Sequence, residues 1–171
     1  QERDTCRDFV VPALEASGWQ SEQVVEQFPV AAQRVAALGG VTRELGSGFV
    51  DYVLEAAPGL MTAVVEAKRE YRAASDGLQQ ALRYAQQLDV PLAYATNGVE
   101  IIEHNLRTGG ERRVSEFAAP AVAWDEYQQL HGLQAADAAL VRQPLNRGRR
   151  NAAGEVITPR YYQAVAINRA L

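Results

Sequence analysis

The sequence predicts an α/β protein in which a mixed central β-sheet is flanked by helices. Two apolar runs, residues 49–54 and 64–67, lie on either side of Pro58-Gly59, a dipeptide that favours reversal of the chain, and together they predict a β-hairpin. Apolar residues at three- and four-residue steps from 78 to 88 then predict an amphipathic helix, and another strand-like run follows at 92–96. Elements in this order are typical of a sheet with helices packed against it.

The composition is that of a globular protein of one domain, or of one domain plus an appendage. The chain has 171 residues, of which 47% are hydrophobic and 22% are charged. No run approaches the roughly 18–20 apolar residues of a membrane span, and no signal-peptide pattern opens the chain. The single cysteine, Cys6, cannot form an internal disulfide, so we expect a reducing, cytoplasmic setting.

The net charge of −4 argues against a protein that holds DNA tightly by itself, because phosphate contacts are made mainly by lysine and arginine. We therefore expect tight DNA binding to depend on something outside this chain. Clustered arginines are still present around the hairpin and near the C-terminal end: Arg69, Arg72, Arg83, Arg142, Arg147, Arg149 and Arg150. No C-x-x-C, G-x-S-x-G or G-x-x-x-x-G-K-[ST] pattern occurs, which disfavours zinc binding, serine hydrolysis and ATP binding within the chain.

The segment before the hairpin predicts one helix and at least one strand. Residues 2–16 have the apolar spacing of an amphipathic helix that Pro12 kinks or shortens, with Gly18 as its stop and Trp19 packed on the core. Residues 24–30 predict a strand, whereas 35–38 fit either a helix or a strand.

The predicted hairpin brings three charged side chains together. If it is centred on its Pro-Gly turn, Asp51 lies opposite Glu66, and Phe49 lies opposite Lys68. Glu66 and Lys68 share a face because strand side chains alternate. Two carboxylates and one ammonium group therefore converge.

This trio has the chemistry of a divalent-cation site that acts on phosphate. Mg²⁺ takes oxygen ligands and commonly uses one or two carboxylates together with phosphate and water. A nearby lysine can orient a water or stabilise the charge that develops on phosphate oxygens. The alternative is a surface ion-pair cluster worth about 0–1 kcal/mol. Asp51 and Glu66 interrupt runs of core-type residues, and this position favours the functional interpretation.

The helix after the hairpin carries two further candidate residues. Asp76 is expected to be its N-cap, with Gln79 completing a capping box. Gln80 and Tyr84 lie one turn apart beside the buried stripe, so both can face the same cleft. Taken alone, they are equally compatible with an ordinary helix border.

The rest of the chain predicts a second hairpin and short helices. Asn97-Gly98 is a strong turn signal between the run at 92–96 and a returning strand at 99–104. Gly109-Gly110 predicts another turn, and residues 124–133 and 137–141 predict helices. His104 and His131 have no ligand spacing between them, and we expect both to be structural or exposed.

The charged residues and their neighbours resemble a known nuclease pattern. Asp51 with Glu66-Ala67-Lys68 resembles the PD-(D/E)xK motif, with Val50 in place of the proline, and Gln80-x-x-x-Tyr84 resembles the QxxxY motif that accompanies it in RecB-like nucleases. Most of residues 2–105 resembles the N-terminal nuclease domain of the restriction (R, or HsdR) subunit of type I restriction–modification enzymes. The flanking words that match are Thr5-Cys6-Arg7, Gly18-Trp19, Asp51-Tyr52-Val53-Leu54, Val65-Glu66-Ala67-Lys68-Arg69, Gly77-Leu78, Gln80-Ala81, Tyr84-Ala85 and Ala95-Thr96-Asn97-Gly98.

The resemblance implies a restriction-endonuclease-like core and Mg²⁺-dependent cleavage of duplex DNA. Asp51 and Glu66 would hold the metal, and Lys68 would assist the attacking water. Gln80 and Tyr84 would position that water or the DNA backbone.

The resemblance also implies partners and a division of the chain. The partners are duplex DNA and the methylation and specificity subunits of a restriction–modification complex, with ATP used only in a motor domain absent from this chain. Residues 1–141 would form the endonuclease-like domain, 142–158 a basic linker, and 159–171 the start of a helicase-type motor. By the same resemblance Glu2 is a candidate accessory metal ligand, with a solvated helix N-terminus as the alternative. Glu44, which precedes the hairpin, is a further candidate that its spacing does not require.

Two other interpretations remain open at this stage. The same fold could serve as a DNA-binding or docking module without cleavage, or as the nuclease domain of a RecB-like repair enzyme. The intact set of Asp51, Glu66 and Lys68 argues against the first, because a non-cleaving module has no need to keep all three.

Overall fold

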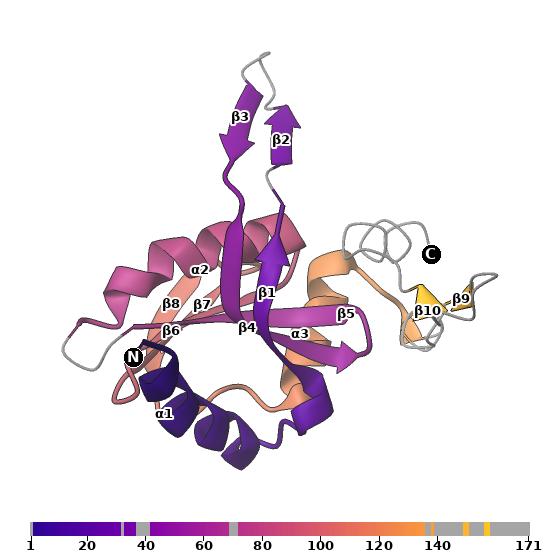
Figure 1. The fold of residues 1–171 in the computed structure, drawn as a ribbon. Helices are drawn as coiled ribbons and strands as arrows, with labels where there is room; N and C mark the ends of the chain where they lie inside the picture. The colour runs from indigo at the N-terminus through magenta and orange to yellow at the C-terminus, as the bar shows by residue number, and fades with distance from the viewer. Residues whose placement is uncertain are drawn as a thin grey trace.

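The computed structural model of the chain describes residues 2–31, 33–36, 42–68, 72–135, 138, 149–150 and 156–157. For residues 2–7, 33–36, 42–45, 149–150 and 156–157 it describes the backbone alone. The elements, shown in Figure 1, are α1 (Glu2–Ala16), the 3₁₀ turn η1 (Ser21–Gln23), β1 (Val24–Val30), β2 (Gln33–Ala36), β3 (Thr42–Leu45), β4 (Gly48–Ala57), β5 (Leu60–Ala67), α2 (Ser75–Leu88), β6 (Leu92–Thr96), β7 (Ile101–Asn105), β8 (Gly110–Val114), α3 (Pro120–His131), β9 (Arg149–Arg150) and β10 (Val156–Ile157).

The main sheet has six strands in the order β1-β4-β5-β6-β7-β8. Neighbouring strands are antiparallel except β5 and β6, which are parallel. A parallel pair needs a crossover connection, and α2 supplies it. The mixed central sheet predicted from the sequence is therefore confirmed.

Helices cover both faces of this sheet (Figure 1). On one face α1, α3 and Trp19 pack on alternate residues of β4, β5 and β6, such as Tyr52, Val65 and Tyr94. On the other face α2 packs on the intervening residues, such as Val53 and Val64. Glu66 follows Val64 on its own face, so the candidate site lies on the α2 side of the sheet.

The hairpin of β4 and β5 has the register predicted from Pro58-Gly59. Its paired residues include Tyr52 with Val65, Val53 with Val64, and Leu54 with Ala63. The second predicted hairpin is also present, since β6 pairs antiparallel with β7 around Asn97-Gly98, and Gly98 takes a positive φ of 86°.

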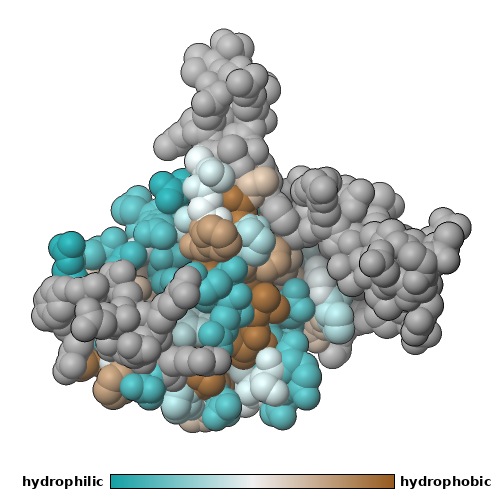
Figure 2. Space-filling view, in the orientation of Figure 1, coloured by the Kyte–Doolittle hydropathy of each residue, from teal (hydrophilic) through white to brown (hydrophobic). Residues whose placement is uncertain are grey.

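Between the end of β1 and the start of β4, the chain forms a two-stranded arm of β2 and β3 that projects upward from the body in Figure 1. The segment that fitted a helix or a strand therefore begins as a strand, up to Ala36. The side of the body shown in Figure 2 is largely hydrophilic, with apolar residues gathered in a narrow strip near the base of the arm.

Two predicted helix starts are wrong. α2 begins at Ser75 with Ala74 as N-cap and without a side-chain cap hydrogen bond. Asp76 is not the N-cap, because it lies inside the first turn of the helix. Its carboxylate is 3.6 Å from the Arg72 guanidinium. α3 begins at Pro120 rather than near Trp124, because proline is well suited to the first helical position.

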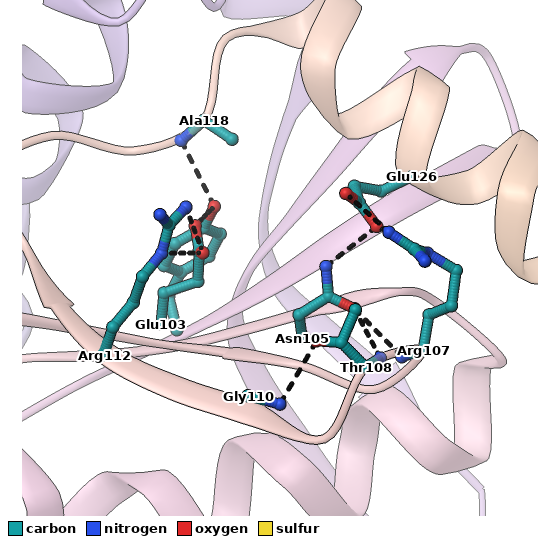
Figure 3. Close-up of polar contacts among 9 residues, drawn as sticks. Glu103, Asn105, Arg107, Thr108, Gly110, Arg112, Ala118 and Glu126 are labelled. Carbon is teal, nitrogen blue, oxygen red and sulfur yellow. Dashed lines mark hydrogen bonds and ion pairs between the residues drawn. The ribbon is translucent and has the colours of Figure 1, made fainter.

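Hydrogen bonds tie the β7–β8 hairpin to the helical layer (Figure 3). Arg107 donates to both carboxylate oxygens of Glu126 in α3, at 3.0 and 3.2 Å, and Asn105 donates to one of them at 2.8 Å. Nearby, Glu103 is buried between Arg112 and the Tyr94 hydroxyl, which donates to it at 2.7 Å. Burial and the Glu103 carboxylate raise the pKa of Tyr94, so its hydroxyl stays protonated and donates. These contacts connect β6, β7 and β8 to one another and to α3, at the end of the strand order away from β1 and β4.

Several predictions fall outside the described residues. Arg69, Arg142, Arg147, most of the helix at 137–141 and the motor-like segment 159–171 lie there, as does most of the linker at 142–158. Within that linker Arg149–Arg150 pairs with Val156–Ile157. Among the described helices, none has the length and apolar character needed to cross a membrane.

Candidate active site

In β4 and in its neighbour β1, the regular alternation of side chains between the two faces of the sheet is interrupted at Asp51. In β4, Val50 and Val53 both pack under α2 although they are three residues apart, and in β1 the same is true of Val25 and Phe28. Residues three apart in a regular strand face opposite sides. The two strands keep one register before and after this point. The break in alternation therefore lies at Asp51 and at the residue opposite to it in β1.

Beside this break, the backbone pairing of β4 with β5 does not extend to Asp51. The paired residues end at Tyr52 and Val65, and beyond them the Ala67 amide donates at 2.9 Å to Oδ2 of Asp51 instead of to a β4 carbonyl. The predicted backbone pairs of Asp51 with Glu66 and of Phe49 with Lys68 therefore do not form. The Asp51 and Glu66 side chains nevertheless approach each other closely enough for Asp51 to perturb the titration of Glu66.

Glu66 is a buried carboxyl group. It is 1% exposed and lies in β5 beside Ala95 of β6. Burial raises its pKa to about 8, the Asp51 carboxylate adds to this rise, and Lys68 opposes it. Its Oε1 atom is enclosed and has no hydrogen-bond partner among the residues that the structure describes. A buried polar atom without a partner is costly, and it indicates a group that accepts a ligand absent from the structure.

Lys68 lies at the end of β5, between Glu66 and α2. Its Nζ is 3.7 Å from Oε2 of Glu66 and donates to Oε1 of Gln80 at 3.1 Å. Its backbone amide donates to the Thr96 carbonyl at 2.7 Å, which anchors the residue to β6. The lysine stem crosses α2 at Gly77, where a Cβ atom would lie 3.2 Å from the lysine Cε. Two of the predicted site residues, Lys68 and Gln80, are therefore in direct contact.

Tyr84 is placed differently from the other predicted residues. Its ring is buried between α2 and the sheet, and its hydroxyl lies against Gly48, where β4 begins. The guanidinium carbon of Arg83 lies 5.2 Å from the ring centre. Tyr84 therefore packs against the start of β4, three residues before Asp51. Gln80, by contrast, contacts Lys68 directly.

The two further candidate ligands receive no support from side-chain geometry. The side chains of Glu2 and Glu44 lie outside the described residues, although the Glu44 backbone pairs with Arg34 in the arm. Within the described ranges, no group of three or more His, Cys, Asp or Glu residues could hold a metal ion. The acidic centre that the structure does describe is the pair Asp51 and Glu66.

This pair fits a hard divalent cation. Such a cation commonly uses one or two protein carboxylates and completes its shell with water and phosphate oxygens. The unpartnered Oε1 of Glu66 and the approach of two carboxylates are the features expected of that site. The raised pKa of Glu66 also means that binding a cation near neutral pH displaces a proton.

The stability of the metal-free protein is expected to fall as pH rises from about 4.5 to about 8. In this window the folded state keeps a proton on Glu66 that the unfolded state releases, so a higher pH favours unfolding. The slope is at most about 1.4 kcal/mol per pH unit for one proton. Urea unfolding in EDTA across this range measures it. Glu66→Gln should reduce this slope but not abolish it, because burial also raises the pKa of Glu55, whereas Glu116→Gln, an exposed control, should keep the full slope. Equal slopes in the wild type and Glu66→Gln would contradict the assignment.

Three residues at the site were not singled out from the sequence. Gln27 donates a hydrogen bond to Asp51, and Gly77 leaves room for the Lys68 side chain. Asn97 donates to the Arg72 carbonyl at 2.9 Å, which connects the residues before α2 to the turn after β6. The sequence contained a signal for Gly77 and Asn97 only, because both belong to the short sequence segments that resemble restriction subunits.

Together the fold and the site define a class of protein. A mixed sheet between helices carries two carboxylates and a lysine at adjacent strand ends, with a helical glutamine bound to the lysine. This is a restriction-endonuclease-like core.

Comparisons with known proteins show which proteins the chain resembles. The chain is 29% identical, over 99% of its length, to the type I restriction enzyme EcoAI endonuclease subunit of Escherichia coli, and spans 21% of that subunit. A solved fragment assigned to an HsdR subunit of a type I restriction enzyme from Vibrio vulnificus YJ016 matches 99% of the chain with a TM-score of 0.77 and 35% identity, and the chain covers 32% of it. No family model matches the chain. The predicted resemblance to the restriction subunits of type I enzymes is confirmed, and the chain spans about a fifth to a third of the length of these relatives.

Proposed function

We propose that this chain is the endonuclease domain of a type I restriction enzyme R subunit and cleaves phosphodiester bonds in duplex DNA with the help of Mg²⁺. The observation that carries the proposal is the contact of Lys68 with both Glu66 and Gln80, next to an Asp51 carboxylate whose two oxygens are held in place. A surface ion-pair cluster does not account for this arrangement, because Glu66 is almost completely buried.

Each residue has a defined part in this proposal. Asp51 and Glu66 hold the cation, which supplies charge neutralisation at the phosphate and a lowered pKa for water. Lys68 orients the attacking water and stabilises the negative charge that develops on the phosphate oxygens. Gln80 accepts a hydrogen bond from Lys68 and so holds the ammonium group toward the carboxylates. Tyr84 supports the start of β4 and acts through Asp51.

The wider system follows from the relatives and is part of the same proposal. The chain would work in the cytoplasm, with methylation and specificity subunits and with an ATP-driven motor in the remainder of the R subunit. The net charge of −4 agrees with this arrangement, because a detached domain with this charge should bind duplex DNA weakly and without preference for sequence.

A nicking assay on supercoiled DNA tests the function. The chain should nick the plasmid in Mg²⁺ but not in EDTA, and Asp51→Asn should reduce the rate by at least about 100-fold, the effect of one positioned catalytic group. Asp125→Asn, an exposed aspartate on α3, is the matched control and should cleave like the wild type. DNA binding without nicking, in the isolated chain and in the full-length subunit, would instead support the non-cleaving docking module.

A further inference from the structure

Gln27 of β1 lies opposite Asp51, at the position where both strands change face. Its Nε2 donates to Oδ1 of Asp51 at 3.1 Å, while the Ala67 amide donates to Oδ2 at 2.9 Å. The two oxygens of one carboxylate are thus held by donors from the strands on either side of β4. With both bonds formed, the carboxylate plane is fixed, and the lone pairs beyond these two bonds lie within hydrogen-bonding reach of the Glu66 carboxyl group.

The backbone of Gln27 has an unusual conformation. Its φ of 51° lies in the left-handed region, which glycine and asparagine adopt more easily than glutamine. Such a conformation is strained in a residue other than glycine and persists only where the surroundings enforce it. Burial does not explain it, because Gln27 is exposed. The conformation does place the amide against the Asp51 carboxylate.

We propose that Gln27 is a positioning residue for the cleavage site, which orients the Asp51 carboxylate so that its remaining lone pairs are presented to a divalent cation together with those of Glu66. This inference rests on the proposed function. Mg²⁺ requires a nearly ideal arrangement of its ligands, and residues that hydrogen-bond a metal ligand commonly set its orientation. The competing explanation is that the backbone conformation of Gln27 serves only the change of face in β1 and β4, and that its side chain has no role in orienting Asp51.

Gln27→Gly separates the two explanations, because glycine adopts the left-handed conformation without strain but carries no amide. The metal-free variant should melt at the same temperature as the wild type or higher. Its affinity for Mg²⁺ in calorimetry and its nicking rate should nevertheless fall roughly 10- to 100-fold. Gln79→Ala, which removes an exposed glutamine next to Gln80, is the matched control and should leave both unchanged.

Hydrogen exchange provides a readout without metal or DNA. In Gln27→Gly the Ala67 amide, which bonds Asp51, should exchange roughly ten-fold faster, as expected for the loss of about one hydrogen bond. The Lys68 amide, which bonds the Thr96 carbonyl, should exchange as in the wild type and serves as the internal control.

Three outcomes would overturn the inference. The first is wild-type Mg²⁺ affinity and Ala67 exchange in Gln27→Gly. The second is a lowered melting temperature with Ala67 and Lys68 exchanging faster together, which indicates a role in strand structure alone. The third is a wild-type result for Gln27→Asn, which tolerates the backbone but is one methylene too short. Failure of the proposed function is distinguishable, because Asp51→Asn would then also bind Mg²⁺ and nick DNA like the wild type.

Discussion

Replacement of Lys68 by alanine is expected to remove most of the cleavage activity while the chain still binds Mg²⁺. The ammonium group lies 3.7 Å from Glu66 and is held by Gln80, so it can act on the water or the phosphate without being a metal ligand. Loss of one such group costs about 10²–10⁴-fold in rate. Single-turnover nicking measures this loss.

Metal binding by Lys68→Ala should be measured above pH 8. Lys68 lowers the pKa of Glu66, and its removal raises that pKa further, so protonation would weaken binding at lower pH. Arg113→Ala removes a positive charge from an exposed ion pair on β8 and should cleave like the wild type. If Lys68→Ala instead keeps its activity but melts at a lower temperature, the lysine is a structural ion-pair partner.

Replacement of Glu66 by alanine is expected to abolish Mg²⁺ binding. Asp51 alone leaves a single carboxylate, and the variant loses the Oε1 atom of Glu66, which has no hydrogen-bond partner among the described residues. In the wild type the apparent affinity should increase as pH rises from 7 to 8, because the cation competes with a proton on Glu66. Calorimetric titration at several pH values measures both effects, with Glu116→Ala as the exposed control. Unchanged binding in Glu66→Ala would remove Glu66 from the site.

The sequence predicted the parts of the fold that depend on local signals. The Pro58-Gly59 turn and the alternating apolar residues around it were sufficient for the register of β4 and β5, because a one-residue slip would expose the core face. Strand alternation predicted that Glu66 and Lys68 share a face, whereas the hydrogen bond between Lys68 and Gln80 is a finding of the structure.

Other features of the site could not be predicted, because they depend on contacts between distant segments. A glutamine with positive φ has no sequence signal, so neither Gln27 nor the change of face at Asp51 was anticipated. Asp76 has the residue type and spacing of an N-cap, but the chain enters α2 already helical at Ala74, and the carboxylate pairs with Arg72 instead.

The central claim is that Asp51 and Glu66 form one metal site in a nuclease. Anomalous scattering from crystals soaked in Mn²⁺, a substitute for Mg²⁺, tests it most directly. The account predicts a peak that adjoins carboxylate oxygens of both residues and that is lost in crystals of Glu66→Ala. A peak elsewhere on the molecule, or a peak that persists at the same position without Glu66, would contradict it.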